Sequence, residues 1–482
     1  MNRFLFYDNG SVPSDEIRQL LGVQRFADVR YRRRTLAQRI ADISQKAELK
    51  LLPLEGQRDR LALEKNLDAS ITVLWVSSAT AFGCSDEDAA LFLKKLSMSR
   101  TSLLVDSNGH RQIAVLVGDL ARQYLRSVDG PEGSQDFLQE IGQEFNRVPS
   151  DVTLFDLRDQ RQFTDYLTSN FDVRFFNAVD PVNDFVVEKK SSDHDKLRNE
   201  FTYYGLLPDE MKAFFVQPYD FQTTGTNSRY KMERLYIPDM AIQWIHGAFD
   251  EMGFERFLTK VFYFLSIRRQ QKVTAEQARE VHLDTYRSKV QRRLQQMRSD
   301  PNYPAIDAYA RAGLRPIDGI LSRYLSLLDQ QAAAPVSAQL CIGHGDLCFS
   351  NIIYEKSTGL MRFIDPKGAA TEKELYLAPS YDVAKLAHSI LGSYDFINYG
   401  LFRIEINADL KLELILDTAP HPWAAALFNR KLVEYGYQPR IIRLFEVSLF
   451  LSMLPMHTDQ PKKVLAFLMR ADQILDEIES QK

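Results

Sequence analysis

Cysteine is scarce in this chain of 482 residues, where Cys84, Cys341 and Cys348 are the only three. Without a C-x-x-C pair, they exclude a disulfide framework and a cysteine-based metal site, which fits a reducing compartment. Long apolar runs are also lacking. The opening sequence MNRFLFYDNGSVPSDE has only a short one, and no stretch approaches the roughly 18 apolar residues of a membrane span. These absences predict a soluble, cytoplasmic protein with no membrane span.

An excess of positive charge is missing as well. The formal net charge is -4 and 26% of the residues are charged, so the composition gives no sign of a nucleic-acid partner. Hydrophobic residues make up 45% of the chain, as in an ordinary globular protein. A chain of this length is too long for one compact core, so two or three domains are expected.

Residues 1–172 alternate strand and helix signals. The segment 71–78, ITVLWVSS, is a nearly continuous β-branched and aromatic run, typical of a strand buried on both faces. Residues 101–118 contain two apolar runs around Ser-Asn-Gly, which predict a hairpin. Asp106 in this segment is a plausible metal position, but an ordinary hairpin turn is favoured there. We therefore expect an N-terminal α/β domain over residues 1–172.

From about Arg174 the pattern changes. Two strand signals flank Asp180-Pro-Val-Asn, a helix signal follows, and another strand, SRYKMERLYIP, comes next. Helical spacing then dominates, two short strands follow, and the tail is mostly helical. This order of elements is that of a two-lobed kinase. It predicts an α+β N-lobe over residues 173–238 and a helical C-lobe over residues 239–482.

Chemistry-bearing residues gather in CIGHGDLCFSNIIYEKSTGLMRFIDPKG, where His344, Asp346, Asn351 and Asp365 have the spacing of a kinase catalytic loop and metal site. Phosphoryl transfer needs a carboxylate at the attacking hydroxyl, metal ions on phosphate oxygens, and a cation on the nucleotide phosphates. SNIIYE and MRFID predict a hairpin that brings Asn351 and Asp365 to one end, where their oxygens suit Mg²⁺. Each residue alone has an ordinary interpretation as a cap, loop or strand end. The joint pattern favours a kinase site.

A family resemblance adds to this interpretation. HGDLCFSNIIY and FIDPKG resemble the aminoglycoside phosphotransferase/choline kinase superfamily. YDVAKLAHSILGSYDFI, YKMERL and EKKSSDHDKLRNEFTYYGLLP resemble the branch of kinase-like domains found in capsular and surface polysaccharide biosynthesis proteins. The similarity covers residues from about 174 to 400, and it implies ATP and Mg²⁺ as cofactors.

The same resemblance implies roles for individual residues. Asp346 would be the catalytic base, while Asn351 and Asp365 would hold Mg²⁺. His344 would brace the loop rather than do chemistry, and Asp382 would be a structural carboxylate beside it. The hinge whose backbone meets the adenine would be Met232, Glu233 and Arg234.

The lysine that would meet the nucleotide phosphates is open between two neighbours in FVVEKKSS. Strict alternation puts Phe185, Val187 and Lys189 on one face of a strand, which favours Lys189. The family string places the lysine directly before the Ser pair, which favours Lys190, and we prefer Lys190. Glu200 in the following helix would pair with whichever lysine is correct. A solvated strand end is the alternative interpretation of both lysines.

A second group of cations lies in YRSKVQRRL, and comprises Arg287, Lys289, Arg292 and Arg293. A solvated helical face explains them without any function. If the acceptor is already phosphorylated or otherwise anionic, they are candidates to bind it. The sequence leaves both interpretations open.

The first domain loosely resembles the sugar nucleotidyltransferase-like half that often precedes kinase-like domains of this branch. Active relatives open with a strand and a Gly-rich loop, because only glycine lets backbone N–H groups crowd a phosphate. RFLFYDNGSVPSDE has a single glycine, and the arginines between Arg30 and Arg34 could bind an anion or an acidic partner instead. We expect a degenerate nucleotidyltransferase-like domain without transfer chemistry.

Three functions compete. The first is an ATP- and Mg²⁺-dependent kinase that phosphorylates a hydroxyl of a sugar, polyol or related small molecule in surface polysaccharide biosynthesis. The second is a bifunctional nucleotidyltransferase-kinase, and the third is a nucleotide-binding pseudoenzyme scaffold. The intact set of Asp346, Asn351 and Asp365 argues against the third. A homo-oligomer or a polysaccharide-assembly partner is possible in each case.

Overall fold

The computed structural model describes residues 3–54, 72–107, 110–127, 137–138, 140, 145–169, 177–332, 338–408, 411–417 and 421–480. The chain divides into two compact units: Met1–Asp172 with His246–Ala248, and Val173–Ile245 with Phe249–Lys482. The expected domain boundary at 172–173 lies outside the described residues. Among the described helices, none combines the length and the apolar character that crossing a membrane requires.

The first unit is built on a six-stranded sheet with strand order β4-β1-β5-β8-β7-β9. The strands β4 and β5 run parallel to β1, while β8 is antiparallel to both of its neighbours, β5 and β7. The predicted hairpin is present, with Leu103 paired to Val115 and Ser107 to His110. The strands are β1(Arg3–Asp8), β4(Lys50–Leu54), β5(Thr72–Ser77), β7(Leu103–Ser107), β8(His110–Val117) and β9(Asn146–Pro149), with short pairs β2(Arg30–Tyr31)–β3(Arg34–Thr35) and β6(Thr80–Phe82)–β10(Leu154–Asp156).

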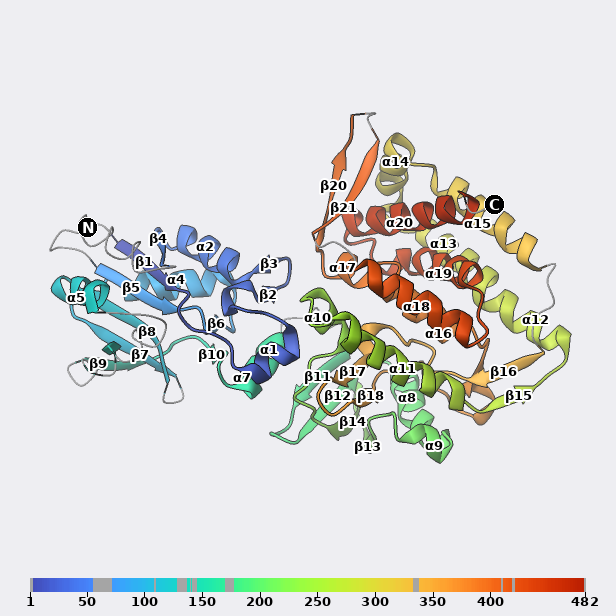
Figure 1. Cartoon of the computed structure of the whole chain (residues 1–482), viewed down its shortest axis with the longest axis horizontal. Helices are drawn as coiled ribbons and strands as arrows, with labels where there is room; N and C mark the ends of the chain where they lie inside the picture. Colours follow the sequence, from blue (N-terminus) through green and yellow to red (C-terminus); the bar gives the residue numbers. More distant parts are fainter. Residues whose placement is uncertain are drawn as a thin grey trace. The chain divides into compact units, whose positions relative to one another are not determined.

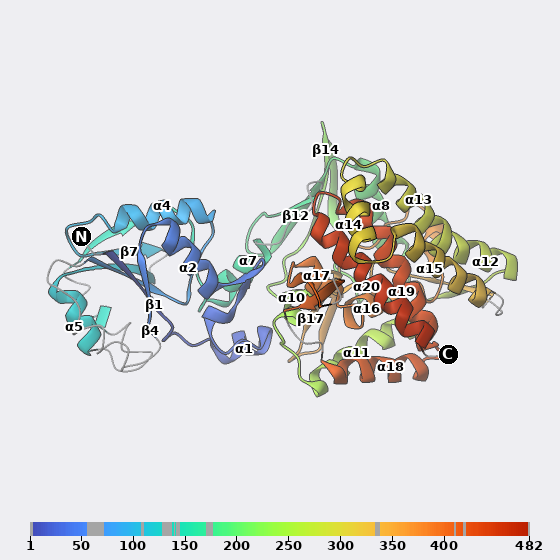
Figure 2. The ribbon, with the colours of Figure 1, turned by 90° about the horizontal axis from the view of Figure 1, so that it is seen from above.

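Both faces of this sheet are covered, because alternate residues of its strands enter two different cores. Leu5 and Leu74 pack with α2(Leu36–Lys46) and α4(Asp86–Leu96), whereas Phe6 and Trp75 pack with α5(Asp119–Ser127) on the other face (Figures 1 and 2). Every residue of β5 is buried, as the apolar run predicts. The remaining helices of the unit are α1(Asp15–Leu21) and α7(Gln160–Ser169).

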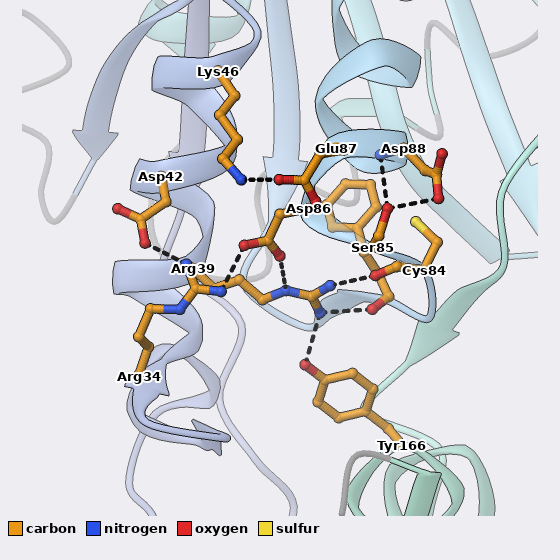
Figure 3. Close-up of polar contacts among 11 residues, drawn as sticks. Arg34, Arg39, Asp42, Lys46, Cys84, Ser85, Asp86, Glu87, Asp88 and Tyr166 are labelled. Atoms are coloured by element: carbon orange, nitrogen blue, oxygen red, sulfur yellow. Dashed lines mark hydrogen bonds and ion pairs between the residues drawn. The ribbon is translucent and has the colours of Figure 1, made fainter. Parts of the chain in front are cut away.

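A buried arginine joins α2 to the N-terminus of α4. The guanidinium of Arg39, whose side chain is 2% exposed, donates to Asp86 Oδ1 at 2.9 Å, to the carbonyl of Cys84 at 2.7 Å and to Tyr166 Oη at 3.2 Å (Figure 3). Arg34 forms ion pairs with Asp42 and with the same Asp86. Arg34 of the arginine cluster is thus paired with carboxylates of its own unit, and binding of an anion or an acidic partner by the cluster stays a prediction.

The second unit begins with a four-stranded antiparallel sheet and one covering helix, and continues with a helical part (Figure 1). The sheet has the order β11-β12-β14-β13, and α8 packs its Leu197 against Tyr230 and Met232 of β14. These elements are β11(Asn177–Pro181), β12(Val186–Ser191), β13(Tyr219–Thr224), β14(Asn227–Glu233), α8(His194–Leu206) and α9(Asp209–Lys212).

The helical part contains the segments that carry the motif. Its core includes α19, where every residue from Leu444 to Met453 is buried and which packs against α16 and α20. The sequence analysis predicted a mostly helical tail and missed the hairpin β20–β21 within it. The helices are α10(Met240–Ile245), α11(Glu251–Ile267), α12(Ala275–Leu283), α13(Lys289–Arg298), α14(Tyr303–Gly313), α15(Ile317–Ala332), α16(Tyr381–Ile390), α17(Tyr394–Asn398), α18(Pro422–Glu434), α19(Pro439–Met453) and α20(Pro461–Ser480). The strands are β15(Gln270–Lys272), β16(Gln339–Ile342), β17(Ile352–Glu355), β18(Leu360–Phe363), β19(Tyr376–Leu377), β20(Phe402–Ile406) and β21(Leu412–Leu416).

Candidate active site

The loop after β16 is braced by a buried histidine. The imidazole of His344 is fully buried, and its Nε2 lies 3.0 Å from the carbonyl of Ile364 while its Nδ1 accepts from the backbone N–H of Asp346 at 3.1 Å. Burial lowers the pKa of His344, so the ring is neutral and Nε2 is the donor. Because both ring nitrogens are bonded to the backbone, His344 shapes the loop.

A buried carboxylate holds the same loop from the other side. Asp382, at the start of α16, accepts the backbone N–H of His344 at 2.9 Å and that of Gly345 at 2.8 Å. The guanidinium of Arg268 donates to Asp382 at 3.2 Å, and both side chains are almost completely buried. Asp382 therefore fixes the loop backbone, as the family resemblance implies.

Asp346 is presented at the surface of the loop and is paired with a lysine. Its carboxylate is 46% exposed, and Oδ1 lies 2.8 Å from Nζ of Lys385, which is 19% exposed. Burial opposes the charge of Lys385, but the carboxylate of Asp346 outweighs it and raises the pKa of this lysine. Lys385 was missed in the sequence, although it follows Asp382 by three residues and therefore lies on the same side of α16.

The β17–β18 hairpin brings Asn351 and Asp365 to one end, as their spacing predicts. Ile352 pairs with Phe363, and the backbone N–H of Ile364 donates to the carbonyl of Asn351 at 3.1 Å. The amide Nδ2 of Asn351 donates to the carbonyl of Asp346 at 2.8 Å, so Oδ1 is the atom it would offer to a metal. Asp365 has a left-handed backbone, with φ of 55°, and its carboxylate is 40% exposed.

These two oxygen donors fit Mg²⁺, which usually takes one or two protein carboxylate or amide oxygens together with water and substrate phosphates. Within the described parts of the chain, no three His, Cys, Asp or Glu side chains come together in a way that would hold a metal ion. A metal ion bound by Asn351 and Asp365 would therefore complete its coordination with nucleotide phosphates and water.

Lys189 is the lysine that the fold turns inward. Its side chain is 1% exposed, and Nζ donates to Glu200 Oε2 at 2.6 Å and to Asp365 Oδ1 at 2.9 Å. Burial opposes the charge of Lys189, but Asp365, Tyr230 and Glu200 raise its pKa, while burial also raises the pKa of Glu200. The cluster joins the sheet, α8 and the segment that carries Asp365.

The preference for Lys190 is wrong on this geometry. Lys190 is 39% exposed and pairs with Asp180 at 3.1 Å and Glu188 at 3.2 Å. Successive side chains of a strand point to opposite faces, so Lys189 and Lys190 cannot both meet Glu200. The pairing with Glu200 therefore favours Lys189, as the alternation argument does, and contact of this lysine with nucleotide phosphates stays a prediction.

The expected hinge lies at the end of β14. Met232 is buried opposite Val187, and Glu233 is the last residue of the strand. The backbone N–H of Arg234 donates to the carbonyl of Phe185 at 2.9 Å, so this amide is already used within the sheet. Contact between adenine and this backbone stays a prediction.

Comparison with known proteins gives a weak structural likeness. No protein-family model and no curated protein sequence matches the chain. The apo crystal structure of a thermostable mutant of aminoglycoside phosphotransferase APH(4)-Ia aligns with a TM-score of 0.37 and 13% identity, covering 61% of this chain and 87% of that one. A ternary complex of such a mutant with AMP-PNP and hygromycin B aligns with a TM-score of 0.36 and 13% identity, covering 65% and 97%. The function proposed below is therefore argued from this chain's own residues.

Proposed function

We propose that the chain is an ATP- and Mg²⁺-dependent kinase that phosphorylates a hydroxyl of a small molecule. The observation that carries the proposal is the ion pair of Lys189 with Asp365 and Glu200, next to a loop that presents Asp346. Such a cluster supplies the cation, the metal ligand and the carboxylate that phosphoryl transfer requires.

Each group would have one task in the reaction. Asp346 would accept the proton of the attacking hydroxyl or orient that hydroxyl, and Lys385 would hold the carboxylate in place. Lys189 would neutralise the nucleotide phosphates, after exchanging its contact with Asp365. Asn351 and Asp365 would hold Mg²⁺, which supplies charge neutralisation at the phosphate oxygens.

The test is ATP turnover by Asp346→Asn in the full chain, assayed by ADP release with and without a panel of sugars, polyols and amino alcohols. We expect at least a 100-fold loss of turnover with MgATP binding retained, since positioned bases contribute about 10²–10⁴-fold. Asp459→Asn, at an exposed aspartate far along the chain, is the matched control. Equal turnover in Asp346→Asn and wild type would reject the kinase. Binding of MgATP without any turnover in wild type would favour the scaffold.

We further propose that the acceptor is a sugar, polyol or related hydroxyl compound of surface polysaccharide biosynthesis, and that the first unit is a nucleotidyltransferase-like fold without transfer activity. The carboxylate of Asp8 at the end of β1 supports the second part. It accepts from Trp75 Nε1 at 3.0 Å and from Tyr124 Oη at 2.8 Å, and is thus committed to structural bonds. Acceptor-dependent pyrophosphate release from an NTP and a sugar 1-phosphate would instead establish the bifunctional enzyme.

A further inference from the structure

We propose that the acceptor is a phosphate ester, and that its existing phosphate binds to Lys289, Arg293 and Lys367 beside the catalytic loop. The inference rests on the proposed kinase function and names the substrate class of that site. It starts from three cations that the proposed chemistry does not use.

A short series of contacts links Lys289 to Asp346. Asp346 pairs with Lys385, and Tyr381 lies one helical turn before Lys385 on α16. The ammonium of Lys289 donates to Tyr381 Oη at 2.8 Å and lies 5.1 Å from the centre of the tyrosine ring. A ligand held by Lys289 would therefore lie on the side of Asp346 from which Tyr381 and Lys385 approach.

Lys367 approaches the loop of Gly345 and Asp346 from the segment that carries Asp365. Its side chain lies over Gly345, because a Cβ on that glycine would come within 2.7 Å of the Cβ, Cγ and Cδ atoms of Lys367. Its backbone N–H donates to the carbonyl of His344 at 2.9 Å, which fixes the start of the side chain. Lys289 is close enough for its charge to act on Lys367, as are the carboxylates of Asp382 and Glu374. The side chain of Lys367 thus lies beside the backbone that directly precedes Asp346.

The helix α13 orients Lys289 and Arg293. Val290, Leu294 and Met297 are buried, which fixes the rotation of the helix. Lys289 and Arg293 are four residues apart and therefore neighbours on its surface. Together with Arg292 and Gln296 they line a groove of about 390 Å³. That volume is in the range of small-ligand sites.

Most cations nearby already have carboxylate partners, and these three do not. Arg287 pairs with Asp329, Arg292 with Asp284 and Arg298 with Asp318. Among the described residues, Lys289, Arg293 and Lys367 take part in no such ion pair, although the charges of Asp382 and Glu374 act on Lys367. A solvated salt-bridged surface does not explain this difference, whereas a dianionic phosphate would match three cations.

The experiment uses matched probes on the full chain saturated with Mg²⁺ and AMP-PNP. Calorimetry compares glycerol with glycerol 3-phosphate, glucose with glucose 6-phosphate and glucose 1-phosphate, and galactose with galacturonate. We expect at least one phosphate ester to bind about tenfold or more tightly than its neutral partner, as charge-assisted hydrogen bonds would give. That preference should fall about tenfold in Lys289→Ala and in Arg293→Ala, and persist in Arg298→Ala, where the replaced cation is on the same helix but already paired.

Several outcomes would overturn the inference. One is that no phosphate ester binds, or that each binds no more tightly than its neutral partner. Another is that only galacturonate is preferred over its neutral partner. The last is that the preference for a phosphate ester survives both Lys289→Ala and Arg293→Ala. The kinase proposal is judged separately, by Asp346-dependent ATP turnover with any acceptor. A kinase that prefers neutral acceptors would reject only the phosphate subsite.

Discussion

Replacing Lys189 by Met would leave a buried carboxylate without its main partner. Glu200 is 4% exposed, and its nearest remaining polar neighbours are Tyr230 Oη at 3.4 Å and Lys196 Nζ at 4.0 Å. An unpaired buried charge costs about 3–5 kcal/mol. Protonation of Glu200 limits this cost, since neutralising a carboxyl with a pKa near 4.3 at pH 7 takes roughly 3–4 kcal/mol. We therefore expect Lys189→Met to lower the free energy of unfolding of the second unit by about 3 kcal/mol at pH 7.

The stability lost in Lys189→Met should depend on pH in a definite direction. In Lys189→Met the folded-state pKa of Glu200 would lie above its unfolded value, so the carboxyl binds a proton more readily when folded. The loss of stability should be largest at neutral pH and should shrink by about 1.4 kcal/mol per pH unit as the pH falls toward about 4.3. Adding Glu200→Gln should restore most of the stability at pH 7, because a neutral amide costs less to bury than an unpaired charge. It should not restore ATP turnover.

Urea unfolding followed by tryptophan fluorescence measures this effect, because Trp244 and Trp423 belong to the second unit. Lys190→Met is the matched control in the adjacent position of the strand. Lys190 and its partner Asp180 are exposed, and its other partner, the buried Glu188, keeps Arg229 at 3.7 Å, so the loss should be at most about 1 kcal/mol. Equal losses in the two variants, or a Lys189→Met deficit that neither acid nor Glu200→Gln relieves, would refute the reasoning.

Three further predictions concern residues whose ion pairs position the candidate site or stabilise the first unit. Lys385→Met should lower kcat for ATP turnover about tenfold or more with little change in KM for ATP, because Asp346 loses the ion pair that positions its carboxylate. Lys385→Arg should recover part of the rate. An unchanged kcat in both variants would contradict the positioning role of Lys385. Asp382→Asn should lower the free energy of unfolding of the second unit by about 3–5 kcal/mol, measured in urea, since Arg268 then loses a buried charged partner. Arg39→Met should have a similar effect on the first unit, and an unchanged near-UV spectrum and melting curve would count against it.

The local patterns of the sequence predicted the parts of the site that depend on neighbouring residues. The spacing of Asn351 and Asp365 predicted the hairpin, and strand alternation identified Lys189. The family string chose Lys190, because a motif position does not record which face of the strand is buried. Lys385 was missed for another reason. Its spacing from Asp382 gives only the side of α16 on which it lies, and its contact with Asp346 is made by the packing of α16 against the loop.

The Lys189–Asp365 contact also has a consequence for the order in which the chain folds. Its two partners are 176 residues apart, and closing a loop of that length costs about 4–5 kcal/mol of chain entropy, apart from a constant term. One ion pair cannot drive such a closure, so the apolar contacts of the sheet, α8 and the helical core must bring the two segments together first. The charged cluster would then form late on the folding pathway. A chain interrupted between these two residues, even with both motifs intact, would lack the site until its pieces had docked.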